Sequence, residues 1–172
     1  MRLLNPQIRR DLDEARPLRI DIGSGPRPRP GFYALDQPEL EGIDIVADLN
    51  QPLDLLPRPG AMIEFIVPHF SDPYAYSDPT HVRFFGLYTM SYFVDPEKQP
   101  HRHKVPAFYT AIRFEIESVY LAFYRFHLLD RLFVPLIRYA VNMSAWTQNA
   151  YERRLSWLFP AAEIRYRMRV CK

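Results

Sequence analysis

The chain has 172 residues, of which 48% are apolar, 24% charged and 15% aromatic, and its formal net charge is +2. This length and composition are typical of one globular domain with a sizeable core. The charge is too small to predict a nucleic-acid-binding protein. The single cysteine, Cys171, excludes an internal disulfide and indicates a reducing, cytoplasmic setting.

The sequence predicts neither a secretory signal nor a membrane-spanning helix. Residues 1–17 lack the long apolar core of a signal peptide. Residues 119–141 are the most apolar region, but they contain three arginines, an aspartate and a histidine. A membrane span needs about 20 mostly apolar residues without such side chains.

Proline is abundant in the first part of the chain, where we expect short strands joined by stiff loops. Prolines alternate with arginines between Gly25 and Gly31, which excludes a regular helix there. Four continuous apolar runs are typical of short buried strands: residues 19–22, 33–35, 43–47 and 61–68. Such runs favour parallel strands covered on both faces by helices.

The second part of the chain contains two alternating segments, at residues 112–117 and 163–171, that are typical of half-buried strands. Glu115 and Glu117 share one face of the first segment, and arginines occupy one face of the second. Antiparallel pairing would set these opposite charges side by side, worth about 0.2–1 kcal/mol per pair. We therefore expect the two strands to pair.

Residues 128–141 and 144–158 are expected to form helices between these strands. Pro135 would break or kink the first helix, Ser144 would cap the second, and Pro160 would stop it. Residues 121–139 mix aromatic side chains with three arginines, which suits a lid, a dimer surface or a membrane-surface patch. A buried helix with snorkelling arginines is the preferred interpretation.

The stretch LRIDIGSGPRPRPGFYALD, residues 18–36, places a glycine turn between two predicted strands. Gly23 lets the chain turn sharply, and Gly25 leaves room for a ligand to approach the backbone. Asp36 ends the second strand, where a carboxylate can accept both hydroxyls of a ribose. The proline and arginine at 26–28 exclude the helix of a dinucleotide fingerprint, so the turn alone favours an ordinary loop.

Followed by DIVADLNQPL at 44–53, this stretch resembles the N-terminal half of class I S-adenosylmethionine-dependent methyltransferases, in a subgroup where a short proline-containing loop replaces the first helix. The stretch PRPGAMIEFIVPHFSDPYAYSDPTHVRFF, 57–85, is similar to a later part of those enzymes, where a KPGG turn, a strand and a DPTH motif occur. The stretch YERRLSWLFPAAEIRYRMRV, 151–170, resembles their final helix and strand. The resemblance therefore covers much of residues 18–170.

The resemblance implies an α/β fold, a Rossmann-like three-layer sandwich whose mostly parallel sheet has an antiparallel C-terminal strand. One domain would span 1–172, with a cofactor-binding half at 18–68 and a substrate, lid and C-terminal half at 69–172. It implies methyl transfer from S-adenosylmethionine to an acceptor that the sequence does not identify. The oligomeric state stays open, a homo-oligomer included.

By the same resemblance, residues of the first half would bind S-adenosylmethionine. They are Asp21, Gly23, Ser24 and Gly25 at the methionine end, Asp36 at the ribose, and Asp48 and Leu49 at the adenine. The sulfonium already activates the methyl group, so the protein mainly has to align a nucleophile with it.

The chain departs from the family after Asp48. In the family, a helix, a mid-sheet strand and a second helix precede the KPGG turn. At average element lengths these three elements and their connections occupy about 40 residues, and this chain lacks them. Natural shortening, an engineered deletion or an incomplete sequence would each account for this. If the deletion is real, we expect the strand at 61–67 to lie beside that at 19–22, because unpaired backbone groups cost about 1–3 kcal/mol each. The alternative function is a non-catalytic remnant that acts as a binding or assembly module.

The stretch VPHFSDPYAYSDPTHVRFFGLY, 67–88, holds the candidate catalytic residues His69 and His81. The favoured interpretation is structural, with both histidines pinning the loop after a strand. If one is catalytic, His81 is the candidate general base, because an unperturbed histidine titrates near neutrality. A metal site is less favoured, and no metal ligand is assigned, because the spacing is not diagnostic.

The same loop follows the carboxyl end of a strand, where open α/β sheets place ligands. Its side chains could therefore wall a pocket for the methyl acceptor, or simply fill the core. The candidate substrate-binding residues are Tyr74, Tyr76, Asp78 and Phe84.

Overall fold

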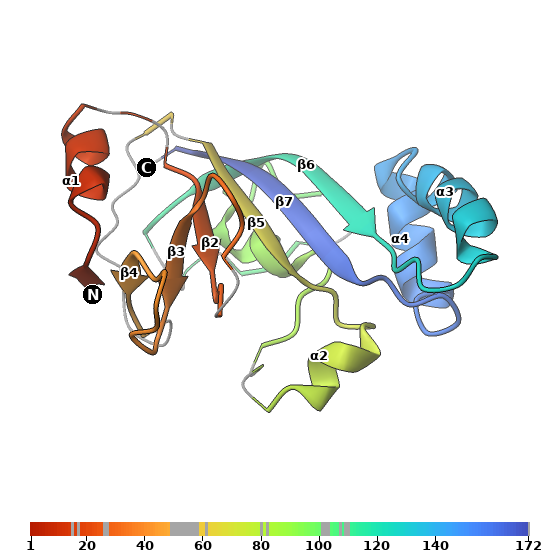
Figure 1. The fold of residues 1–172 in the computed structure, drawn as a ribbon. Helices are drawn as coiled ribbons and strands as arrows, with labels where there is room; N and C mark the ends of the chain where they lie inside the picture. Colours follow the sequence, from red (N-terminus) through yellow and green to blue (C-terminus); the bar gives the residue numbers. More distant parts are fainter. Residues whose placement is uncertain are drawn as a thin grey trace. The chain divides into compact units, whose positions relative to one another are not determined.

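A computed structural model describes residues 1–14, 16, 18–25, 28–48, 59–60, 62–79, 81, 83–100, 104–106, 108 and 111–171. The chain divides into two compact units, Met1–Ala61 and Met62–Lys172. The first contains a mostly parallel sheet and the second a separate antiparallel sheet, each with helices (Figure 1). The expectation of a mixed α/β chain is confirmed. No helix in the described part of the chain is long and apolar enough to cross a membrane.

The sheet of the first unit has four short strands in the order β1-β4-β3-β2. They are β1 (Arg2–Leu3), β2 (Ile20–Ile22), β3 (Tyr33–Asp36) and β4 (Ile45–Val46). The strands β2, β3 and β4 are parallel, and β1 runs antiparallel to β4. Three of the four continuous apolar runs therefore form parallel strands, as predicted, although β4 is shorter than the run that contains it. The fourth run, 61–68, contains an antiparallel strand, so the prediction is wrong there.

The helix α1 (Pro6–Asp13) contributes to the core of the first unit, and the sequence pattern did not predict it. It begins because the Asn5 side chain accepts a hydrogen bond from the Gln7 amide (3.0 Å) and a proline occupies its first position. Its one fully buried side chain, Ile8, packs with Leu35 and Ile45 of the sheet. Ile8 and the partly buried Leu12 therefore anchor the helix to the sheet.

The sheet of the second unit is antiparallel, with β7 (Glu163–Val170) between β5 (Met62–Pro68) and β6 (Phe114–Ala122). The predicted pairing of the two alternating segments is confirmed. Glu115 lies opposite Arg169, and Glu117 forms ion pairs with Arg167 and Arg169. The apolar face of β7 is buried and provides much of the core: Ile164, Tyr166, Met168 and Val170.

The expectation that the strand at 61–67 lies beside that at 19–22 is wrong. β5 pairs with β7 from Met62–Arg169 to Pro68–Glu163, as an outer strand of the other sheet. It spans seven residues, whereas β2 spans three. The eight-residue strand β7 can pair with all seven residues of β5, so it satisfies more of the β5 backbone donors and acceptors than β2 could. The pairing also lets the partly buried Phe65 and Val67 of β5 pack on the core that β7 provides.

Helices and a 3-10 turn surround the second sheet: α2 (Pro73–Ser77), η1 (Thr89–Phe93), α3 (Asp130–Val141) and α4 (Ala145–Arg154). Pro135 lies inside α3, so the expected break there is not observed. The Ser144 cap is confirmed, with a capping box to Thr147. The helix α4 ends at Arg154, ahead of Pro160, because turns closed on the Leu155 carbonyl replace its next residues.

The interpretation of 121–139 as a buried helix is wrong. Leu132, Leu136 and Tyr139 of α3 are exposed to 64%, 64% and 72%. Only Ile137 and Val141 of this helix pack on the core. The helix therefore has apolar side chains on its inner face and also on its outer face.

Two side-chain amides attach α3 and α4 to strand β6. The Asn142 amide donates to the Leu121 carbonyl (2.9 Å) and its Oδ1 accepts from the Leu121 amide (2.8 Å). The Gln148 amide donates to the Val119 carbonyl (2.7 Å). These bonds satisfy backbone groups at the outer edge of the sheet, as a further strand would.

Asn142→Ala is expected to lower the free energy of unfolding by about 1–3 kcal/mol, because it leaves both backbone groups of buried Leu121 without a partner. Urea denaturation measures this change. Asn149→Ala is the matched control, since Asn149 accepts one bond from the Tyr88 hydroxyl, and its loss should stay below about 1 kcal/mol. Equal losses in the two variants would contradict this role of Asn142.

Candidate functional site

The glycine turn after β2 has the conformation that the sequence predicts. Gly23 and Gly25 have φ angles of 69° and 56°, in the left-handed region that favours glycine. The Gly23 amide donates to the Leu35 carbonyl (2.8 Å), which holds the turn against β3. A Cβ atom on either glycine would meet no heavy atom of the described residues within 4 Å. As far as these residues define it, the space beside the turn is open to a ligand.

The Asp36 carboxylate points back to this turn. Its Oδ2 accepts a hydrogen bond from the Gly25 amide (2.7 Å), and its Oδ1 accepts one from the Gln37 amide (2.7 Å). Each carboxylate oxygen has a second lone pair, so the group can still accept hydrogen bonds from a ligand. The end of β3 and the turn after β2 thus form one local structure.

The other predicted cofactor residues lie around the same edge. Asp21 accepts a hydrogen bond from the Arg29 amide (3.0 Å), so it fixes the loop between β2 and β3. The Ser24 hydroxyl is buried and has no hydrogen-bond partner among the described residues. A buried hydroxyl in this state suits a water molecule or a ligand group. Asp48 is half-buried and follows β4 closely, whereas Leu49 lies outside the described residues.

Strand register brings these residues to one edge of the first sheet. Ile22 pairs with Leu35, and Asp36 pairs with Val46, so the carboxyl ends of β2, β3 and β4 are neighbours. Parallel sheets bind ligands at this edge. A separate hollow lies at the opposite end of β2 and β3, near Arg19 and Tyr33. There a hydrogen bond from the Tyr33 hydroxyl (2.6 Å) lowers the pKa of Asp11.

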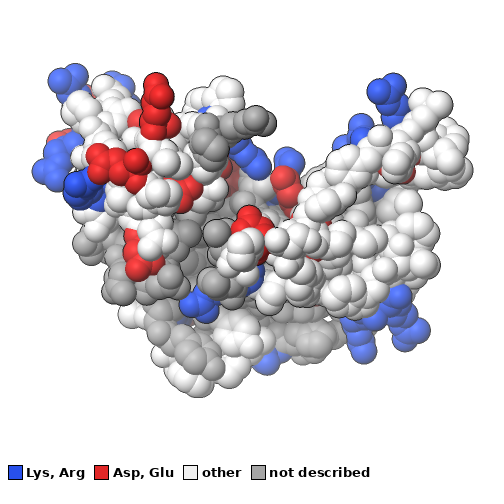
Figure 2. Space-filling model, turned by 60° about the horizontal axis from the view of Figure 1, so that its bottom comes forward, with Lys and Arg blue, Asp and Glu red and all other residues white. Residues whose placement is uncertain are grey.

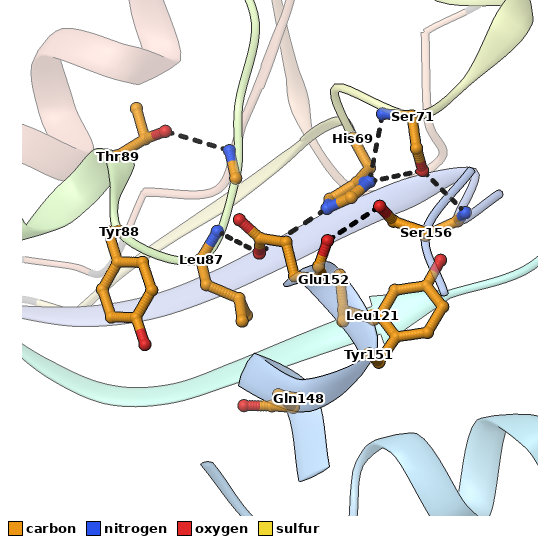
Figure 3. A network of polar contacts seen from close by, with 12 residues as sticks. His69, Ser71, Leu87, Tyr88, Thr89, Leu121, Gln148, Tyr151, Glu152 and Ser156 are labelled. Atoms are coloured by element: carbon orange, nitrogen blue, oxygen red, sulfur yellow. Dashed lines mark hydrogen bonds and ion pairs between the residues drawn. The ribbon is translucent and has the colours of Figure 1, made fainter. Parts of the chain in front are cut away.

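His69 is fully buried in the second unit (Figure 3). Its Nδ1 lies 2.7 Å from the Ser71 hydroxyl and accepts a hydrogen bond from the Ser71 amide (3.2 Å). The other ring nitrogen, Nε2, lies 3.8 Å from Glu152 Oε2. With none of its surface exposed, His69 fits the structural interpretation rather than contact with a substrate.

The polar network around His69 joins distant segments of the second unit (Figure 3). Glu152 of α4 accepts a hydrogen bond from the Leu87 amide (2.8 Å), and Ser71 accepts one from the Ala161 amide (3.1 Å). Burial raises the pKa of the neighbouring Tyr151, whose hydroxyl donates to the Phe159 carbonyl (2.6 Å). Sequence inspection missed Ser71 and Glu152, because neither belongs to a spacing pattern.

His81 belongs to a different cluster from His69. Its amide donates to the Asp78 carbonyl (3.2 Å), and its Nε2 lies 3.8 Å from Asp78 Oδ2. Both side chains are exposed, at 39% for His81 and 44% for Asp78. His81 is therefore the candidate histidine that solvent and a substrate can reach. No group of three or more possible metal ligands occurs in the part of the chain that the structure describes.

The predicted substrate residues form two aromatic clusters on the second unit. Tyr76 stacks on Phe84, with ring centroids 4.7 Å apart. Tyr74 packs edge-on against Tyr124 (5.5 Å) and also contacts Phe126. Burial, with a hydrogen bond to Asp72 (3.0 Å), raises the pKa of the Tyr124 hydroxyl. The aromatic residues after 120 were missed as members of this cluster because they lie about fifty positions along the chain from Tyr74.

No family model, curated protein or solved structure matches this chain. The chemistry of the site is therefore inferred from its geometry. The carboxyl edge of the first sheet offers a carboxylate, an open glycine turn and an unpaired hydroxyl. This set suits a ligand that carries hydroxyl groups and needs close approach to the backbone.

Ser71→Ala is expected to lower the free energy of unfolding by about 1–3 kcal/mol, because it removes the hydroxyl that contacts His69 Nδ1 and leaves the buried Ala161 amide without its acceptor. Chemical denaturation followed by tryptophan fluorescence measures the loss. Ser77→Ala is the control, since its hydroxyl bonds only the exposed Pro73 carbonyl. If both variants were as stable as the parent chain, the structural role of the His69 network would be disproved.

Proposed function

We propose that the first unit binds S-adenosylmethionine and that the chain is an S-adenosylmethionine-dependent methyltransferase-like protein with an unidentified acceptor. The observation that carries the proposal is the Asp36 carboxylate, which is directed at the Gly25 amide beside the open turn. A carboxylate at the end of the second parallel strand can accept the two hydroxyls of an adenosine ribose. The turn then leaves the adjacent backbone free for the rest of the ligand.

Two further features of the first unit support this proposal. The buried Ser24 hydroxyl in the turn lacks a partner among the described residues and is a candidate donor to the ligand. Asp48 follows β4 at the same edge, where the adenine would lie. Asp21 is already bonded to the Arg29 amide, so its proposed part is to shape the turn.

We infer that the two sheets are the separated halves of a Rossmann-like three-layer sandwich. Among the described strands, β2 is an outer strand of the first sheet and β5 is an outer strand of the second. By comparison with methyltransferases, a missing mid-sheet strand would be the neighbour of each of these outer strands. Its loss is the proposed reason for two compact units where the resemblance implies one continuous sheet.

His81 is the proposed general base, since it is exposed and has Asp78 as its neighbour. The proposed setting is cytoplasmic. A non-catalytic binding module is the second candidate function. The burial of His69 favours this non-catalytic function, because it leaves His81 as the accessible one of the two candidate catalytic histidines.

Calorimetric titration with S-adenosylhomocysteine tests cofactor binding. We expect a dissociation constant in the micromolar range for the parent chain. Gly23→Arg should abolish binding because its side chain occupies the open space at the turn. Asp36→Ala should weaken binding about tenfold or more, because it removes a charged acceptor.

Gly31→Arg is the matched control. Gly31 also has a positive φ (80°) with open space around its Cβ position, but it precedes β3 at the opposite end from the proposed site. Its binding should equal that of the parent chain, with thermal melts confirming that all variants fold. No detectable heat at millimolar ligand would reject the proposal, and so would equal binding by the Gly23 and Gly31 variants. Binding without any turnover on candidate acceptors would favour the non-catalytic module.

A further inference from the structure

Residues 126–159, all of which the structure describes, carry thirteen large apolar side chains that are exposed. We call this the apolar surface. It comprises the segment before α3, the outer face of α3, the start of α4 and the turn at 155–159. In Figure 2 this part of the molecule, at the right, is broadly uncharged with basic side chains at its margins. Exposed apolar areas of this extent mark interaction sites.

The outer face of α3 shows that the exposure follows a pattern. Leu132, Leu136 and Tyr139 are spaced by four and three residues, which places them on one face of the helix, with Phe133 beside them. A surface helix normally presents polar side chains there. The bonds from Asn142 and Gln148 to β6 hold the helices in this orientation, so the outer face cannot turn into the core.

The charged residues of the same segment indicate what kind of partner the apolar surface would bind. Residues 125–159 contain five arginines and two acidic residues, Asp130 and Glu152. Both acids are engaged within the fold, since Asp130 accepts from the Phe126 and His127 amides and Glu152 from the Leu87 amide. In the described part of the chain, no ion pair involves any of the five arginines. The apolar surface is therefore accompanied by unneutralised positive charge.

Arginine and tryptophan side chains of the apolar surface indicate a membrane interface. Arg138 lines a hollow of about 280 Å³ together with Tyr139 and Met143. Trp146 and Trp157 are exposed to 65% and 70%. Tryptophan and tyrosine concentrate at membrane–water interfaces, and arginine binds phosphate groups with several donors. An apolar helix face with tryptophans and arginines is the composition of an interfacial helix.

We infer that the apolar surface docks on a lipid bilayer with anionic headgroups. The helix α3 would lie in the plane of the interface, with its leucines and Phe133 among the acyl chains and the arginines at the phosphates. A second copy of the chain is a poorer occupant, because a symmetric pairing would bring the arginines of two such surfaces together. The inference concerns the second unit and does not depend on cofactor binding by the first.

Co-sedimentation with vesicles tests this inference. The chain should bind vesicles of phosphatidylcholine mixed with phosphatidylglycerol and bind those of phosphatidylcholine alone at least about tenfold more weakly. Raising sodium chloride from about 0.1 M to about 1 M should weaken binding to the anionic vesicles, since the Debye length falls to about 3 Å.

Two pairs of variants separate the apolar and the charged contributions. Leu132→Gln with Leu136→Gln should lower the partition coefficient at least about tenfold, whereas Leu40→Gln, at an exposed leucine of the first unit, should not change it. Arg153→Glu with Arg154→Glu in the last turn of α4 should weaken binding to anionic vesicles. Arg9→Glu with Arg10→Glu in α1 is the matched control for this adjacent pair. Circular dichroism should give the same helix content for each variant and its control.

Three results would overturn the inference. The first is failure of the parent chain to bind anionic vesicles. The second is equal vesicle binding by the Leu132/Leu136 variant and the Leu40 control. The third is a dimer in light scattering that this variant dissociates while vesicles bind no chain, which would assign the apolar surface to a second copy.

Discussion

The alternation of side chains along β7 is the constraint on which the second unit depends. Every second residue from Ile164 to Val170 is buried, and the arginines between them face the other way. A slip of one residue would expose the apolar set and bury the guanidinium groups, so the register is strongly specified. Because β7 is the central strand, its register also sets the positions of β5 and β6.

That register has a direct consequence for His69. His69 directly follows Pro68, which forms the last residue pair of β5 with β7, and the His69 amide donates to the Ala162 carbonyl (3.2 Å). The imidazole is thereby placed in the interior, where Ser71 and Glu152 surround it. Ser71 contacts His69 and binds the Ala161 amide, and Glu152 of α4 binds the Leu87 amide, so these side chains together join the loop after β5 to α4.

The first unit is organised differently. Its strands are two to four residues long, so no single strand pair provides an extensive core. The bond from the Gly25 amide to Asp36 instead connects the ends of β2 and β3. The features that support cofactor binding are thus concentrated at one edge. The features that support membrane docking lie on α3 and α4 of the other unit, where many large apolar side chains are exposed.

Features that depend only on neighbours along the chain could be predicted from the amino-acid sequence. The left-handed turn at Gly23, the Ser144 cap and the alternation that pairs β6 with β7 all follow from local stereochemistry and residue period. The tertiary structure alone decided that β5 pairs with β7, that Glu152 reaches His69, and that the outer face of α3 stays uncovered. These outcomes depend on which distant segments compete for the same backbone partners and interior space. A local sequence pattern does not specify which segment wins that competition.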